Sequence, residues 1–235
     1  MKGVAAWIVF VAAALGLVAQ PSDPPREPAQ ATAPAPTSSP APLPIPALEP
    51  VDPTPVPMRR TARPIDDVEI PLDYRRWAKR YSRLFMPPGF DSRWVLCQMR
   101  AESNFVSAAV SPVGAAGLMQ IMPETWRELQ KKMRWVNNIW NPEQNIAAGV
   151  KYLAAQRAAW KARRPEKDRL ALAFAAYNAG LGNPLKAQRI CISEDAGNCN
   201  RWRPIARFAP RVRTWKHVET LTYVNRIFDY MGEKI

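Results

Sequence analysis

The chain has 235 residues and a formal net charge of +13, with 33 Lys and Arg residues against 20 Asp and Glu residues. Three cysteines and one histidine nearly exclude a zinc site, which needs about four Cys, His or carboxylate ligands at defined spacing. The chain has neither GxGxxG nor GxxxxGK[ST], so a dinucleotide or nucleotide phosphate site has no support.

The positive charge is concentrated after the first quarter of the chain. The residues before Met58 include 2 basic and 4 acidic ones, which leaves 31 basic and 16 acidic residues, a net charge of +15, from there onward. So basic a segment favours anionic partners such as nucleic acid, phospholipid or an anionic wall polymer. A solvated surface without a specific partner is the alternative.

The N-terminus has the pattern of an export signal. Lys2 precedes an uncharged, mostly apolar run over residues 4–19, which is slightly shorter than the roughly 18–20 residues that span a bilayer. Small residues near its end offer a cleavage site. We therefore expect a secretory signal peptide over residues 1–20, with an uncleaved membrane anchor as the alternative. Either one takes the rest of the chain out of the cytoplasm.

Residues 21–57 contain 14 prolines and no glycine. Proline fixes φ and lacks the amide donor, so this stretch cannot build a helix or a sheet ladder. We expect a disordered linker. An extended spacer and a tail without a spacing role are both consistent with this composition.

From residue 58 the composition changes, and residues 58–235 are expected to form one domain. Its expected helices cover residues 72–85, 91–105, 123–133, 141–162, 167–180 and 216–231. Asn141 is the expected N-cap of the fourth helix, with Pro142 at its first position, and Gly180 ends the fifth. Because no segment alternates with a period of two, the fold class is mainly α.

Two of the three cysteines flank a short polar stretch, at Cys191 and Cys199. In an exported protein this spacing predicts a disulfide, with two free thiols as the alternative. Cys97 lies among apolar residues of an expected helix and is interpreted as a buried thiol.

The expected helix at 91–105 carries an acid on its apolar side. Val95, Met99 and Glu102 are spaced by four and three residues, so they share one face. Burial there disfavours the charged form of Glu102 and raises its pKa, as a general acid at neutral pH requires. The alternative is a helix-end glutamate that reaches water or a basic neighbour such as Arg100. The glycine-spaced segment that follows, "SPVGAAGLMQIMP", fits neither helix nor strand and is expected to form a wall of a cleft.

Four blocks of the sequence resemble the soluble lytic transglycosylase domain, a relative of goose-type lysozyme. They are "ES-F…S-VGA-GLMQIMP-T", "NPEQNIAAGVKYL", "ALAFAAYNAGLG" and "ETLTYVNRI", in the expected order over roughly residues 72–231. The resemblance implies a lysozyme-like helical domain. Residues 1–57 have no part in it, and the stretch 188–215 is longer and more basic than the family pattern.

The resemblance also implies roles for particular residues. Glu102 matches the family's sole catalytic acid and base. The residues that match the sugar-binding positions or the neighbourhood of the acid are Ser111, Gln120, Met122, Tyr177, Asn178, Glu219 and Tyr223. The alternatives are core packing for Met122 and Tyr177, and a solvated helix charge for Glu219.

The implied activity is cleavage of the β-1,4 bond between N-acetylmuramic acid and N-acetylglucosamine, with 1,6-anhydro ends as the product and with no metal or cofactor. The alternatives are a hydrolytic muramidase on the same fold and a non-catalytic wall-binding part of an envelope assembly. The implied partner is the peptidoglycan strand, and not nucleic acid. We expect a periplasmic monomer, with attachment to the inner membrane through the N-terminal segment or the basic surface left open.

Overall fold

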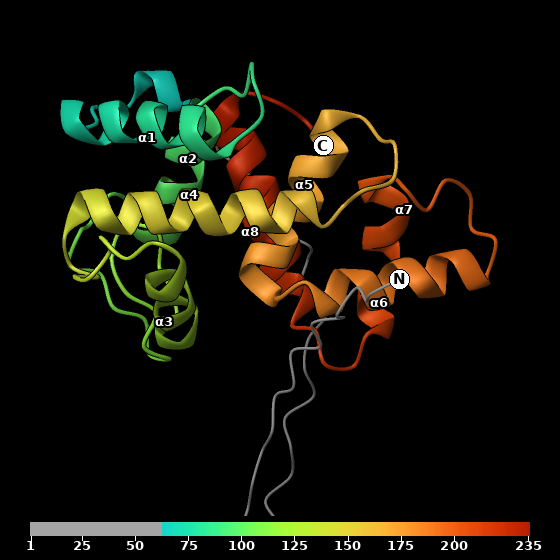
Figure 1. Cartoon of the computed structure of the whole chain (residues 1–235). Helices are drawn as coiled ribbons and strands as arrows, with labels where there is room; N and C mark the ends of the chain where they lie inside the picture. Colours follow the sequence, from blue (N-terminus) through green and yellow to red (C-terminus); the bar gives the residue numbers. More distant parts are fainter. Residues whose placement is uncertain (1–62) are drawn as a thin grey trace, which may run out of the picture. The chain divides into compact units, whose positions relative to one another are not determined.

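The computed structural model describes residues 63–235 and shows that they are mainly helical (Figure 1). The expected signal or anchor segment and the proline-rich linker lie outside the described residues. In chain order the helices are α1 (Leu72–Phe85), α2 (Arg93–Ser103), α3 (Pro123–Lys132), α4 (Pro142–Ala158), α5 (Glu166–Ala179), α6 (Gly182–Ser193), α7 (Trp202–Arg207) and α8 (His217–Met231). Two short 3-10 helices, η1 (Ile65–Asp67) and η2 (Ala209–Arg211), complete this part of the chain. Within it, no helix is long and apolar enough to cross a membrane.

Helix α5 forms the centre of the core. Residues 171–176 are completely buried, and the helix packs against α4, α6, α7 and α8. A helix that is apolar on every side is stable only when neighbours surround it. Trp94 of α2, Phe174 of α5 and Phe228 of α8 join in one aromatic cluster, with ring centroids 4.7–6.4 Å apart. The core therefore ties α2, α5 and α8 together.

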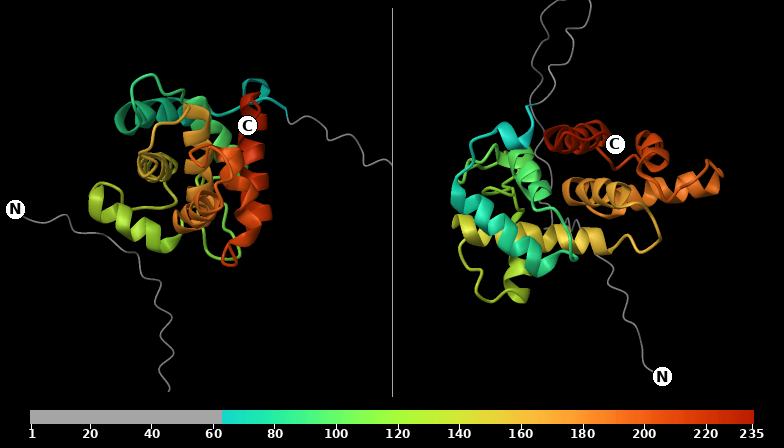
Figure 2. Two further views of the ribbon diagram at one scale, coloured as in Figure 1. Left: turned by 90° about the vertical axis from the view of Figure 1, so that its right-hand side faces the viewer. Right: turned by 90° about the horizontal axis from the view of Figure 1, so that it is seen from above.

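Two helix pairs flank this centre. Helix α1 lies beside α4, and α2 lies beside α8 (Figures 1 and 2). The second pairing brings the C-terminal end of the expected acid-bearing helix to a helix more than 100 residues away in sequence.

The helix boundaries follow the sequence signals closely. The Asn141 side chain accepts a hydrogen bond of 3.0 Å from the Gln144 amide, which confirms it as the N-cap of α4. At the start of α2, Asp91 Oδ1 accepts a hydrogen bond of 2.9 Å from the Arg93 amide, whereas the Ser92 side chain makes no capping hydrogen bond. Gly180 ends α5 with a φ of 77°, in the region that favours glycine.

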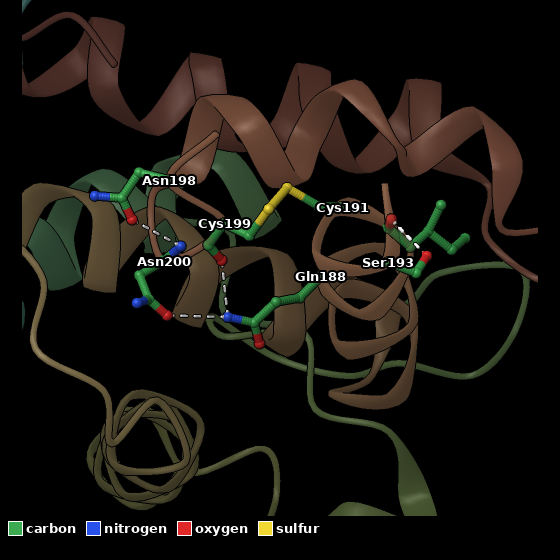
Figure 3. The surroundings of a disulfide bond; sticks show 7 residues. Gln188, Cys191, Ser193, Asn198, Cys199 and Asn200 are labelled. Carbon is green, nitrogen blue, oxygen red and sulfur yellow. Dashed lines mark hydrogen bonds between the residues drawn. A yellow bond between two sulfur atoms is a disulfide. The ribbon is translucent and has the colours of Figure 1, made fainter. Parts of the chain in front are cut away.

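Helices α6 and α7 fall in and next to the long basic segment, where the sequence predicted no element. The structure joins Cys191 in the last turn of α6 to Cys199 in the loop before α7, which confirms the disulfide (Figure 3). Gln188 supports the same loop, because its Nε2 donates to the Cys199 carbonyl at 2.9 Å. Cys97 is a buried free thiol, and burial raises its pKa to about 12.

Candidate active site

Glu102 lies in the last turn of α2, on the face that the sequence predicted. Val95 and Met99 on that face are completely buried. Asn104 ends the helix in the left-handed conformation, with a φ of 49°. The chain therefore turns away directly after Glu102 and leaves its side chain at the end of an apolar helix face.

Two tyrosines from other helices surround the acid. The Tyr223 hydroxyl, on α8, donates a hydrogen bond of 2.5 Å to Oε1 of Glu102. Tyr177, on α5, is close enough for the charge of Glu102 to raise its pKa, although burial raises it more. Helices α2, α5 and α8 thus meet at this carboxyl group.

Burial raises the pKa of Glu102 to about 8, while the hydrogen bond from Tyr223 and the neighbouring amide of Gln98 lower it. Glu102 keeps some exposed surface. With this pKa, Glu102 is mainly protonated at neutral pH. It could then donate a proton to a substrate atom that contacts its exposed part.

Arg100, the basic neighbour that the sequence offered as a partner for Glu102, contacts other groups. The Arg100 guanidinium donates to the Arg63 carbonyl and lies 3.9 Å from the ring centroid of Tyr230. Among the described residues, the causes of the shifted pKa of Glu102 include burial, Tyr223 and Gln98 but no charged group. The acid is therefore held by neutral donors alone.

The glycine-spaced segment forms a compact loop beside the acid. It contains two isolated β-bridges, Val110 with Ala116 and Ala116 with Ile121, and no regular strand. Ser103 Oγ, next to the acid in sequence, donates to the Leu118 carbonyl at 2.9 Å, and the Tyr177 hydroxyl donates to the Met119 carbonyl at 2.8 Å. Side chains on both sides of the acid therefore fix the loop.

Helix α4 holds the other side of this loop through Asn145, which is buried. Its Oδ1 accepts from the Met119 amide at 2.8 Å, and its Nδ2 donates to the carbonyls of Ala116 and Ile139 at 3.1 and 3.0 Å. Gly117 must be glycine here, because its φ is +78° and a Cβ would lie 2.2 Å from Asn145 Nδ2. One amide side chain thus ties α4 to the backbone that lines the acid.

The other predicted site residues are distributed over the loop and over α5 and α8. In the loop, Ser111 Oγ accepts from the Ala115 amide at 3.0 Å, and Gln120 Nε2 donates to two loop carbonyls at 3.0 Å. Both polar groups therefore stabilise the loop, which the sequence did not predict. Met122 is 37% exposed just before α3, so it is not core filler.

On the far helices the structure pairs one predicted residue and leaves another in solvent. Asn178 is exposed at the end of α5, and its Oδ1 accepts from Thr220 of α8 at 2.7 Å. Glu219 is exposed in the first turn of α8, one turn before Tyr223. Their roles toward a sugar stay predictions.

Sequence reasoning missed three residues that shape the site. Asn145 and Ser103 lie inside the sequence blocks that resemble the transglycosylase domain, so these blocks could have indicated them. Gln98 had no such signal, since a lone glutamine within an apolar helix predicts nothing about its neighbours. Within residues 63–235 no three His, Cys, Asp or Glu side chains lie together so that they could hold a metal ion.

The raised pKa predicts how the variant Glu102→Gln changes stability with pH. Between its ordinary value of 4.5 and about 8, the carboxyl binds a proton in the folded state and not in the unfolded state, so stability falls as pH rises through this window. Replacement by the neutral amide removes this loss, and we expect a gain of up to about 3 kcal/mol at pH 7 and little at pH 4. Urea unfolding of both proteins at the two pH values measures it, and an equal difference at both would contradict the raised pKa.

Comparison with known proteins gives a consistent result. Residues 87–197 match the model of the transglycosylase SLT domain. Membrane-bound lytic murein transglycosylase F of Alteromonas mediterranea is 32% identical over 146 residues, which cover 61% of this chain and 30% of the relative. The protein of that name from Desulfosudis oleivorans is 34% identical over 136 residues, covering 57% and 28%. The chain thus spans less than a third of the length of these relatives.

Among solved structures, an inactive mutant of the lytic transglycosylase Slt from Pseudomonas aeruginosa superposes with a TM-score of 0.53 and 28% identity. The superposition covers 68% of this chain and 24% of that one. The match to the family model includes the acid, the loop, α4 and α5, and it ends before α8. Residues 87–197 of the chain are therefore similar to the transglycosylase SLT domain.

Proposed function

We propose that this protein is a peptidoglycan lytic transglycosylase in which Glu102 is both the acid and the base. The observation that carries the proposal is the Glu102 carboxyl at the end of an apolar helix face, hydrogen-bonded by the Tyr223 hydroxyl at 2.5 Å and with its pKa raised to about 8 by burial. Its relatives are named lytic murein transglycosylases, and its structural neighbour is a lytic transglycosylase.

The number of carboxyl groups at the site bears on the type of reaction that we propose. Most glycosidases need two carboxyl groups within about 10 Å, one of which acts as nucleophile or activates water. Within residues 63–235, no second acid is among the causes of the shifted pKa of Glu102, and Glu124 lies in the first turn of α3, paired with Arg127 at 3.7 Å. A site with one carboxyl fits a reaction in which the substrate supplies the attacking groups.

The proposed reaction proceeds in two steps. Glu102 gives its proton to the oxygen that bridges N-acetylmuramic acid and N-acetylglucosamine, and the bond from that oxygen to the anomeric carbon breaks. The acetamide of the muramic acid stabilises this carbon. The C6 hydroxyl of the muramic acid then attacks the anomeric carbon and closes a 1,6-anhydro ring. The proton of this hydroxyl passes to Glu102, which restores the acid. No water is consumed.

The surrounding residues support this cycle in distinct ways. Tyr223 donates to the carboxyl and so stabilises the charge that Glu102 carries between the two steps. The loop around Met119, held by Tyr177 and Asn145, offers a fixed backbone edge along which a sugar chain is expected to lie. Asn178 and Glu219 would contact the sugars from the far side.

We further propose that the protein works in the bacterial envelope and is held near its substrate by charge. The segment 188–215, which contains the disulfide, contributes six basic and two acidic residues. Attachment to a membrane would come through this surface or through the N-terminal segment.

Release of soluble material from purified sacculi tests the proposed activity. We expect the full-length protein to lower the turbidity of a sacculus suspension at pH 7, since the acid is protonated there. A folded protein that binds sacculi and releases nothing would instead support the non-catalytic alternative.

A further inference from the structure

Gln98 is an amide without a hydrogen-bond partner in the middle of the core. Its side chain, on α2, is completely buried, and neither Nε2 nor Oε1 has a partner within the described structure. A buried polar group without a partner costs the fold free energy. An apolar side chain at this position would avoid that cost. A role of the amide in function would explain why glutamine stands here.

The surroundings of Gln98 indicate which groups the amide faces. Glu102 follows four residues later on α2, so the two side chains share a helix face. The amide lowers the pKa of both Glu102 and Tyr223, as an N–H group directed at their oxygens does. Tyr177, from α5, is the third group that faces the acid. Among the described residues no cation takes part in this cluster.

We propose that Gln98 is a positioning residue for Glu102, whose amide donates hydrogen bonds to the Glu102 carboxylate and to the Tyr223 oxygen while Glu102 is ionised. The inference rests on the proposed transglycosylase reaction, in which Glu102 is ionised between the two proton transfers. An amide carries two N–H donors and no charge, so one side chain can serve both oxygens.

The benefit of such a donor depends on the charge of the acid. A hydrogen bond to a carboxylate is about twice as strong as one to a neutral oxygen, so the amide acts mainly on the ionised state. Because the donor is already in place, no reorganisation is needed when the charge develops. The unpaired amide then destabilises the resting state, in which Glu102 is protonated, and stabilises the intermediate, in which Glu102 is ionised.

Replacement of Gln98 by methionine tests this directly. Methionine has the same length and no amide, so the full-length variant is expected to fold with an unchanged or higher Tm. In a protein labelled with 13C-glutamate, the carboxyl signal that disappears in Glu102→Gln reports the titration of this residue. We expect its midpoint to rise by about one pH unit in Gln98→Met, because the ionised form has lost a donor.

A matched control separates this role from a structural one. Gln156 is also a buried glutamine with an unpartnered Oε1, but it lies on α4 and does not affect Glu102. Gln156→Met should leave the Glu102 midpoint unchanged even if Tm moves. If Gln98→Met fails to fold, Gln98→Leu takes its place. A wild-type midpoint in the folded variant would overturn the proposal.

The activity assay distinguishes this inference from the proposed function. If sacculi are cleaved, the alkaline limb of the kcat profile should move upward with the midpoint, and kcat should fall about tenfold while KM stays constant. If the wild-type protein releases nothing although the midpoint shifts, the proposed function fails and the link between Gln98 and Glu102 stands. If turnover is normal and the midpoint is unchanged, Gln98 has no such role.

Discussion

Glu102→Gln is expected to fold normally and to release soluble fragments from sacculi at least about 100-fold more slowly than the wild type. The amide has nearly the same shape, so it can still accept the hydrogen bond from Tyr223. It cannot give a proton to the leaving oxygen or take one from the C6 hydroxyl, and both steps of the proposed cycle need that transfer. Initial rates of turbidity loss at pH 7 measure the effect.

The matched control for this variant is Glu124→Gln. Glu124 is an exposed residue in the first turn of α3 and forms a surface ion pair with Arg127. Its replacement should leave the rate within about twofold, because an exposed ion pair contributes less than about 1 kcal/mol. Near-normal turnover by Glu102→Gln would refute the assignment of the acid.

Asn145→Ala should be the most destabilising of the substitutions discussed, by about 3–5 kcal/mol. It removes three hydrogen bonds and leaves the Met119 amide and the carbonyls of Ala116 and Ile139 without partners. Each buried group left unpaired costs about 1–3 kcal/mol. Since the same bonds hold the loop beside Glu102, activity should fall even at a temperature where the variant is folded.

Urea unfolding measures this loss, with Asn200→Ala as the control. Asn200 is exposed in the loop after the disulfide, so its replacement should change the free energy of unfolding by less than about 0.5 kcal/mol. Equal stability of the two variants would mean that α4 does not hold the loop through this side chain.

The helices that the sequence predicted well are those with local signals. Asn141 and Pro142 mark the start of α4, and Gly180 marks the end of α5, because capping depends on neighbours within one turn. The face that bears Glu102 was also predicted, since helical periodicity is a local property. Helices α6 and α7 lack such signals: α6 begins at Gly182 with Pro184 in its first turn, and α7 has only six residues.

The partners within the site could not be derived from local pattern. Glu102 and Tyr223 are separated by 121 residues, and only the packing of α2 on α8 brings them within hydrogen-bond distance. The resemblance named both residues but gave no contact between them. For Gln120 it gave a role toward sugars, whereas the structure shows its amide bonded inside the loop. Gln98 carries no sequence signal, because its significance lies in what faces it across the core.

Mass spectrometry of the fragments released from sacculi tests the proposed chemistry most directly. With one carboxyl and an internal hydroxyl as the attacking group, the wild-type protein should produce muropeptides with 1,6-anhydro-muramic acid ends, each lighter by one water than the hydrolytic product. Glu102→Gln should give neither product. Fragments with reducing muramic acid ends would contradict the proposed mechanism and show that water, rather than the C6 hydroxyl, attacks beside Glu102.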